Sequence, residues 1–443
     1  DIGDRIFTNL SPGEGETEAE ARFFLMVGDN VYVDNYYDRL VDAGEQPPGA
    51  GKTLQQFYYD AYRDSWGFPD FRRALMNTPT FMIFDDHEYW NNWGNEQSHQ
   101  FDNEGLPRAL RAYEAYQDSH NPGVEQRHKQ CPKKYHYTFS YGDVGFFVLD
   151  CRTRRNPTAL PFRTMLGSEQ REELLSWLRD NKERYRIKFV VSSVPITFMA
   201  LPSWFINLFH GGLGDQWAGY PTERRIIFDV IKEENISGVH FLSGDIHLGQ
   251  GVVIKPEDGK APTVHSFTAS PLANTFSLLP EVAPSWGSAL AGGLLGALAG
   301  VLITLFNLFG SKRSVLSGLF WGIVVGAAAG ELLRRLLNFW FPSREHSKPG
   351  PIGRKVYALI SKLVQKNYMR RVLGVAKDEI DVKEMTYKPE NMFEPVFGRN
   401  MGLVTIGKKD EVKFVLLDEC GNSHEELKDC APDMQTGKSK SEE

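Results

Sequence analysis

The stretch Thr80–Glu88 reads TFMIFDDHE, and it is the most informative segment of the chain for the fold. Thr80–Phe84 is almost wholly apolar at successive positions, which is typical of a short strand that is covered on both faces. Four titratable residues, Asp85 to Glu88, follow at once. Placing four ionisable side chains directly after a buried strand costs folding free energy, so such a group indicates a functional site. The stretch therefore predicts a buried strand whose carboxyl end carries chemistry.

Further runs share this pattern of a short apolar segment that is closed by polar or glycine-rich residues. They are Phe23–Val27, Gly145–Leu149, Phe189–Val194, Val239–Leu242 and Val264–Thr268. Amphipathic helical patterns lie between several of them, one after Ser168 and another after Thr222. Strands that alternate with helices predict an α/β layered domain.

Polar clusters fall just past four of these strand ends. They begin at Gly28 (GDN), Asp85 (DDHE), Asp150 (DCR) and Ser243 (SGDIH). In open α/β sheets, ligands bind beyond the carboxyl ends of the strands, so we expect the clusters to meet at one rim. Carboxylates that are brought this close repel one another, and cations relieve that repulsion. The sequence therefore predicts a site with several metal ions.

One segment differs in composition. Residues 287–311 and 314–330 carry no charge, and glycine recurs at every fourth position in both runs. The first run is long enough to cross a hydrocarbon core, and small residues at this spacing let two helices pack closely in lipid. We predict an apolar helical hairpin in a membrane. A buried helix pair or an oligomer contact is the alternative.

The chain accordingly divides into four parts. We predict a catalytic core at 1–284, the apolar hairpin at 285–341, a C-terminal helix with closing strands at 342–430, and a disordered tail at 431–443. The helix is expected at Tyr357–Leu373, and the closing hairpin at Met401–Ile406 and Val412–Leu417. The segment Glu96–Tyr137 is polar and rich in histidine, and it predicts an excursion over the surface or the active site.

The charge balance excludes one class of function. Lys and Arg number 50 against 57 Asp and Glu, so the formal net charge is −7. A nucleic-acid-binding protein usually has a basic excess, and none is present. Basic residues gather at the base of the predicted hairpin (Arg334, Arg335, Arg344 and Lys348), which favours a membrane-associated protein with its main domain in the cytoplasm.

The motifs GDNVY, FDDHE, LDCR and SGDIH, in this order, resemble those of the PhoD-like alkaline phosphatases, a branch of the calcineurin-like metallophosphoesterases. The resemblance covers roughly Phe23 to Leu272 and leaves the hairpin out. It implies a four-layer α/β/β/α sandwich of two mixed sheets, and hydrolysis of phosphate monoesters or diesters by a metal-bound hydroxide. A secreted or periplasmic location would also agree with it.

The resemblance also implies a set of metal ligands. Asp29 would bridge two metals, and Tyr32 and His247 would bind the trivalent one, because the Asp-x-x-Tyr spacing is similar to that of the purple acid phosphatases. Asp86 and Asp245 would bind the second metal. The family suggests Fe³⁺ with Ca²⁺, and an oxygen-rich second site also suits Mg²⁺ or Mn²⁺.

Three further residues receive catalytic roles by the same resemblance. His87 would face the substrate as an electrostatic stabiliser or general acid, Arg152 would clamp phosphate with its forked guanidinium, and Asp150 would hold Arg152 or a metal. The family's first strand carries another ligand several dozen residues before Asp29. Only 28 residues precede Asp29 here, so we expect either a trimmed chain or an incomplete iron site.

The expected partners are a phosphate-ester small molecule or a phospholipid head group, a membrane through residues 287–341, and a second copy of the chain through the glycine-spaced helices. The rival hypothesis is a catalytically inactive, membrane-anchored scaffold with a phosphatase fold. A metal assay with a chromogenic phosphate ester separates the two.

Overall fold

The computed structural model describes residues 21–49, 51–91, 93–94, 102–157, 163–197, 217–247, 249–256, 259, 261–270, 387–392, 399–407, 411–418 and 423–428. The chain forms two compact units, Asp1–Phe276 with Met369–Glu443, and Ser277–Tyr368, and every described residue belongs to the first. The predicted hairpin at 285–341, the predicted helix at 357–373 and the predicted tail at 431–443 lie outside the described residues. Among the residues that are described, no helix has the length and apolarity to cross a membrane.

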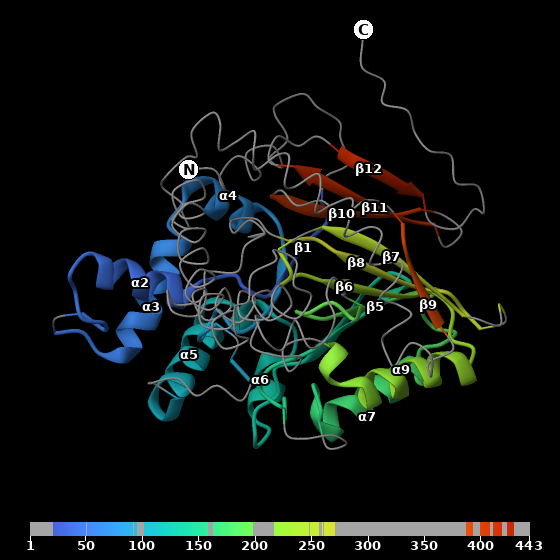
Figure 1. Cartoon of the computed structure of the whole chain (residues 1–443), viewed down its shortest axis with the longest axis horizontal. Coiled ribbons are helices and arrows are strands. Elements are labelled where there is room, and N and C mark those ends of the chain that lie inside the picture. Colours follow the sequence, from blue (N-terminus) through green and yellow to red (C-terminus); the bar gives the residue numbers. More distant parts are fainter. Residues whose placement is uncertain are drawn as a thin grey trace, which may run out of the picture. The chain divides into compact units, whose positions relative to one another are not determined.

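The largest sheet of the described chain has the strand order β3-β4-β5-β6-β8-β7-β9, and Figure 1 labels its strands β5 to β9. Strands β4, β5, β6 and β8 run parallel, so their carboxyl ends share one edge, whereas β3, β7 and β9 each pair antiparallel to a neighbour. The strands are β3 Tyr137–Tyr141, β4 Val144–Val148, β5 Ile187–Val191, β6 Val239–Ser243, β7 Gln250–Pro256, β8 Val264–Thr268 and β9 Tyr387–Asn391. The predicted mixed α/β fold is confirmed.

Two helices cover one face of this sheet, α7 (Gly167–Asp180) and α9 (Pro221–Glu233). Leu174 and Leu178 of α7 join Phe147 of β4 and Ile227 of α9 in one buried cluster. The periodicity of the apolar residues predicts both helices, and it is this apolar stripe that they bury against the strands.

Further strands cover the opposite face. β1 (Phe24–Val27) and β2 (Thr80–Ile83) pair in parallel, and β10 (Asn400–Ile406), β11 (Val412–Asp418) and β12 (Ser423–Lys428) form an antiparallel set. Ile83 of β2 and Phe414 of β11 share a buried cluster with Phe146 and Phe189 of the large sheet. The described chain thus has one layer of helices and two of strands. The four-layer arrangement stays a prediction.

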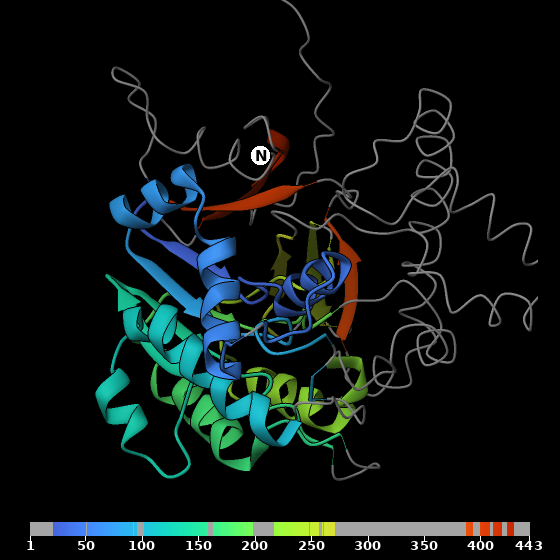
Figure 2. The ribbon, with the colours of Figure 1, turned by 90° about the vertical axis from the view of Figure 1, so that its left-hand side faces the viewer.

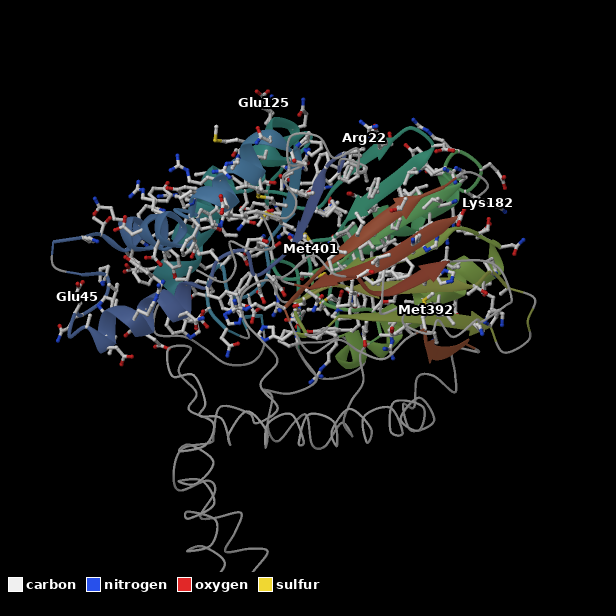
Figure 3. The ribbon with its side chains drawn as sticks, turned by 90° about the horizontal axis from the view of Figure 1, so that it is seen from above. Arg22, Glu45, Glu125, Lys182, Met392 and Met401 are labelled. Carbon is white, nitrogen blue, oxygen red and sulfur yellow. The ribbon has the colours of Figure 1, made fainter. Side chains whose placement is uncertain are left out.

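The remaining helices follow β1 or β2 in the chain, except η3, which follows β5. They are α2 (Val33–Asp42), α3 (Leu54–Ser65), α4 (Pro69–Asn77), α5 (Asp102–Tyr116), the 3-10 helices η1 (Asp118–His120) and η3 (Trp217–Gly219), and α6 (Val124–His128). Buried Phe57 and Tyr58 of α3 share an apolar cluster with Ala109 and Ala112 of α5, and Figure 2 shows these helices in blue and cyan. Glu45, beyond the end of α2, lies far from the strand residue Met401 (Figure 3).

Candidate metal centre

Two strand-end loops meet because their strands are parallel. β1 and β2 run in register from Phe24 opposite Thr80 to Val27 opposite Ile83, so residues 28–34 and 85–88 arrive at the same edge. We call these two segments the metal loops. Gly28 allows their approach, because it has a φ of +98° and a β-carbon there would lie 2.7 Å from that of Asp85.

The loop after β6 reaches the same place. The backbone N–H of Gly244 donates to the carbonyl of Ser193 (3.1 Å), and a β-carbon on Gly244 would lie 3.0 Å from a methyl group of Val27. Asp245 and His247 therefore arrive next to the end of β1. Three of the predicted ligands, Asp29, Asp245 and His247, have positive φ angles of 54°, 68° and 54°. Non-glycine residues seldom adopt this conformation, and it concentrates at functional sites.

Four carboxylates converge at this edge. One oxygen from each of Asp29, Asp85, Asp86 and Asp245 lies within 4.8 Å of all the others. Asp85 and Asp86 are buried, and Oδ1 of Asp29 and Oδ2 of Asp85 are also buried and find no hydrogen-bond donor among the described residues. Asp29, Asp86 and His87 form a second group with the same separation. The structure thus brings together three of the predicted ligands and adds Asp85.

This crowding changes the proton affinity of Asp29. Burial, together with the neighbouring carboxylates of Asp86, Asp85 and Asp245, raises its pKa well above the usual value, against the opposing charge of His87. A bound cation removes the same penalty by supplying positive charge. Orphaned buried oxygens and mutually repelling carboxylates fit hard cations such as Ca²⁺, Mg²⁺ or Mn²⁺.

Tyr32 and His247 adjoin the carboxylates. The Tyr32 hydroxyl donates to Oδ2 of Asp29 (3.2 Å) and lies 3.1 Å from Nε2 of His247. Burial, and then the charge of His87, lower the pKa of His247 to about 4, which leaves a neutral imidazole at neutral pH. A phenol, an imidazole and a carboxylate therefore face one point, and Asp29 belongs both to this group and to the four carboxylates.

His87 is oriented by a carboxylate that the sequence alone does not single out. Its Nδ1 lies 2.9 Å from Oδ1 of Asp34, in the first turn of α2, and its ring packs on Tyr32 with centroids 4.1 Å apart. Burial alone lowers the pKa of His87, but Asp34, Asp29 and Asp86 outweigh it and raise the pKa well above its ordinary value. The carboxylates around His87 therefore favour its protonated form.

Arg152 and Asp150 have different surroundings. The Arg152 side chain is 0% exposed and donates to Asp85, to Asp86 (3.1 Å) and to the carbonyl of Trp93 (2.8 Å). Asp150 accepts from the backbone N–H groups of Arg152 (3.0 Å) and Thr153 (2.9 Å), and it is not a member of the carboxylate cluster. Asp150 thus shapes the loop that presents Arg152.

The sequence assigns no individual role to two members of this site, Asp85 and Asp34, although Asp85 belongs to the DDHE cluster. Asp85 precedes Asp86, and consecutive strand residues point to opposite faces, so one of the two is ordinarily excluded. β2 ends at Ile83, and beyond it the chain bends so that both carboxylates reach the cluster. Asp34 lies in the first turn of a helix, where an acidic residue is common without any function.

The fold and this site together define a mixed α/β protein with an acidic centre, at a sheet edge, that suits several cations. The model of the PhoD-like phosphatase family matches residues 14–278, which is more than half of the chain, so the chain belongs to that family. This match confirms the family that the four motifs indicate.

Individual proteins are similar to parts of this chain. Alkaline phosphatase D of Bacillus subtilis (strain 168) is 27% identical in an alignment of 222 positions that covers 44% of this chain and 35% of that protein. A solved structure of PhoD aligns with a TM-score of 0.46 and 19% identity, over 61% of this chain and 54% of that one. The chain thus spans about a third to a half of the length of these relatives.

Two other solved structures are more distant. A purple acid phosphatase from yellow lupin (Lupinus luteus) seeds has a TM-score of 0.34 and 11% identity, over 60% of this chain and 38% of that one. A dimetal phosphatase from Danio rerio has a TM-score of 0.35 and 12% identity, over 62% of this chain and 78% of that one.

Proposed function

We propose that this chain is a metal-dependent phosphoesterase that hydrolyses phosphate esters. Membership of the PhoD-like phosphatase family supports the reaction class. The observation that carries the proposal is the meeting of Asp29, Asp85, Asp86 and Asp245, with two buried oxygens that lack donors among the described residues. Burying several carboxylates together costs free energy, and bound cations lower that cost.

The roles follow from the contacts. Asp29 would bridge two metal positions, because it contacts Tyr32 beside His247 and also belongs to the carboxylate cluster. Tyr32 and His247 would hold one metal, for which we propose Fe³⁺. Asp86 and Asp245 would hold a second, for which the oxygen donors suit Ca²⁺, Mg²⁺ or Mn²⁺. Elemental analysis of the purified protein tests this assignment.

The protein's own groups would complete the reaction. When bound, the cations would neutralise phosphate charge and lower the pKa of a coordinated water so that it can attack. His87, oriented by Asp34, would donate its proton to the leaving oxygen. Arg152 is fully paired with Asp85, Asp86 and Trp93, so clamping phosphate would require its guanidinium to exchange at least one of these partners.

The test replaces single ligands without changing their shape. Asp86→Asn and Asp245→Asn should each lower hydrolysis of a chromogenic phosphate monoester and diester by at least about a hundredfold, since losing even an outer partner of a metal ligand costs 10–100-fold. The matched control is Asp143→Asn, because Asp143 is a surface residue that pairs with Arg186. It should keep full activity.

Circular dichroism of each variant distinguishes lost chemistry from lost folding. Near-full activity of either ligand variant with metal present would contradict the site assignment. A wild-type protein that binds metal but hydrolyses neither ester would instead favour the inactive scaffold.

We also propose that the substrate is a phosphate ester or a phospholipid head group, and that the chain associates with membranes through residues 287–341. Its two uncharged, glycine-spaced runs, 287–311 and 314–330, support this, and the segment lies outside the described residues. Flotation of the full chain with phospholipid vesicles tests it.

A further inference from the structure

A buried carboxylate joins the two metal loops. Glu88, which is 1% exposed, accepts from the backbone N–H of Asn30 (2.7 Å) and from that of Asp85 (2.8 Å). Asn30 follows Asp29 in one metal loop, and Asp85 lies in the other. Glu88 therefore sets the separation between the loops that carry Asp29 and Asp86.

Gln117 completes this network from the end of α5. Its Oε1 accepts from Nδ2 of Asn30 (2.7 Å), and its Nε2 donates to Oε1 of Glu88 (3.1 Å) and to the hydroxyl of Tyr62 (2.9 Å). The side chain is completely buried. One orientation of the amide suits these partners, because a turned amide would place its oxygen against the Glu88 carboxylate and its NH₂ against that of Asn30.

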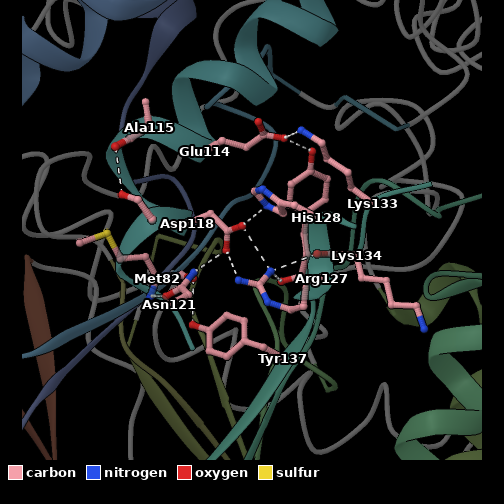
Figure 4. Close-up of polar contacts among 12 residues, drawn as sticks. Met82, Glu114, Ala115, Asp118, Asn121, Arg127, His128, Lys133, Lys134 and Tyr137 are labelled. Atoms are coloured by element: carbon pink, nitrogen blue, oxygen red, sulfur yellow. Dashed lines mark hydrogen bonds and ion pairs between the residues drawn. The ribbon is translucent and has the colours of Figure 1, made fainter. Parts of the chain in front are cut away.

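The segment after Gln117 is itself anchored to β2. Asn121 accepts from the N–H of Met82 (2.9 Å) and donates to its carbonyl (2.8 Å), as a neighbouring strand would. Asp118, completely buried, accepts from Arg127 (2.7 Å) and from Asn121 (3.0 Å) and lies 2.7 Å from Nε2 of His128 (Figure 4). The chain that presents the glutamine is thereby held in one register against the strand.

We propose that Gln117 is a positioning residue for the metal centre. It touches none of the predicted ligands, and it acts through Asn30 and Glu88 to keep the two metal loops at the spacing that lets Asp29 and Asp86 share cations. This inference rests on the proposed metal-dependent function. It assigns to the polar segment between β2 and β3 a part in assembling the centre.

The test is Gln117→Met, which keeps length and burial but removes the amide. In metal-free protein, amide hydrogen exchange of Asn30 and Asp85 should become at least about tenfold faster, because Glu88 loses the partner that holds it. The dissociation constant for Mn²⁺, measured by titration calorimetry with Mn²⁺ alone, should rise about 10–100-fold, as for other outer partners of metal ligands.

The matched control is Lys188→Met. Lys188 is also completely buried, and its Nζ donates to the carbonyls of Tyr185 (2.6 Å) and Ser237 (3.1 Å) near the start of β5, at the opposite end of the strands from the metal loops. It should lower the melting temperature to a similar extent but leave Mn²⁺ affinity and the two exchange rates unchanged. Equal changes in both variants, or an affinity of Gln117→Met within twofold of wild type, would overturn the inference.

A second variant and the metal-free protein distinguish loss of folding from loss of metal binding. If Gln117→Met does not fold, Gln117→Asn takes its place, because the shorter amide cannot reach both Asn30 and Glu88, and the same thresholds apply. If the wild-type protein binds no Mn²⁺, Fe³⁺ or Ca²⁺, the proposed function fails. The exchange rates of metal-free protein then still decide whether Gln117 holds the loops.

Discussion

Gly28 shows how much of the centre depends on one missing β-carbon. Its φ of +98° and the 2.7 Å distance that an added methyl group would have from Asp85 are separate penalties at one position. Gly142, in the turn between β3 and β4, has a φ of +60° with no atom within 4 Å of such a methyl group. Gly142→Ala therefore adds only a left-handed backbone angle, whereas Gly28→Ala adds a close contact and a φ outside the left-handed region of L-residues.

Gly142→Ala should lower the free energy of unfolding by about 1–2 kcal/mol, the usual penalty of a left-handed conformation. Gly28→Ala should cost about 1–3 kcal/mol more, because the added methyl group overpacks the metal loops. Denaturant titration of both variants measures the difference. Equal losses would mean that the loops can move apart without cost.

Single residues of the site could be predicted where an ionisable side chain directly follows an apolar strand, because such a placement is uncommon. Asp29, Asp86 and Asp245 each follow an apolar strand; parallel pairing of β1 with β2 brings the first two together, whereas Asp245 arrives from β6 of the other sheet. Gln117 and Asp34 could not be predicted, because a glutamine after a helix and an acid within one are ordinary residues. Their roles depend on contacts with residues 30 and 87, which are distant in sequence.

At the scale of elements, α7 is tied to the start of β3 by Glu173. This carboxylate binds Lys134 (2.5 Å) and His136 (2.8 Å). Burial alone raises its pKa, but the hydrogen bonds from Lys134 and His136 outweigh burial and lower the pKa below its usual value of 4.5. A lowered pKa means that folding favours the charged form, so the pair stabilises the protein above pH 4.5 and loses that effect as the pH falls below it.

Glu173→Gln should therefore reduce the free energy of unfolding at pH 7 by at most about 1 kcal/mol, because Glu173 is partly exposed and such pairs are weak. The difference from wild type should shrink as the pH falls below 4.5. Glu172→Gln is the control, since Glu172 pairs with its neighbour Arg171 and lies mostly in solvent. If the difference in unfolding free energy between Glu173→Gln and wild type grew as the pH fell, the pKa of Glu173 would not be lowered by folding.

Two fully buried strands of the large sheet could be predicted almost to the residue. β8 lies at the predicted Val264–Thr268, all five residues of which are buried, and β6 exceeds its predicted range by one residue. β3 was missed because only Tyr137 of its residues is buried. α5 was missed because Gly105 and Pro107 disguise a helix that tertiary packing against α3 stabilises.

At the scale of the whole molecule, the centre is a source of instability that metal binding would reverse. Four clustered carboxylates repel one another in metal-free protein. Asp29→Asn should raise the melting temperature of metal-free protein, because it removes one charge and because asparagine tolerates the φ of 54° at this position. Stability is commonly given up at functional sites in this way.

The same variant should lose the stabilisation that metal provides. A ligand that binds only the folded state, present at a free concentration of a hundred times its dissociation constant, adds about 2.7 kcal/mol to the free energy of unfolding. Mn²⁺ should thus raise the melting temperature of the wild type but not of Asp29→Asn, as calorimetric scans with Mn²⁺ or EDTA would measure. If metal-free Asp29→Asn melted at a lower temperature than metal-free wild type, repulsion among the carboxylates would not be the dominant effect of Asp29 on stability.

The pairing of β7 with β9 has a consequence for synthesis on the ribosome. β7 ends at Pro256, whereas its partner begins at Tyr387, so residues 257–386 must be translated before the hydrogen bonds on that side of β7 can form. Until then a nascent chain presents an open strand to its neighbours on a polysome, which is the geometry that favours edge-to-edge association. A stop codon placed shortly before residue 387 would leave that strand uncovered permanently.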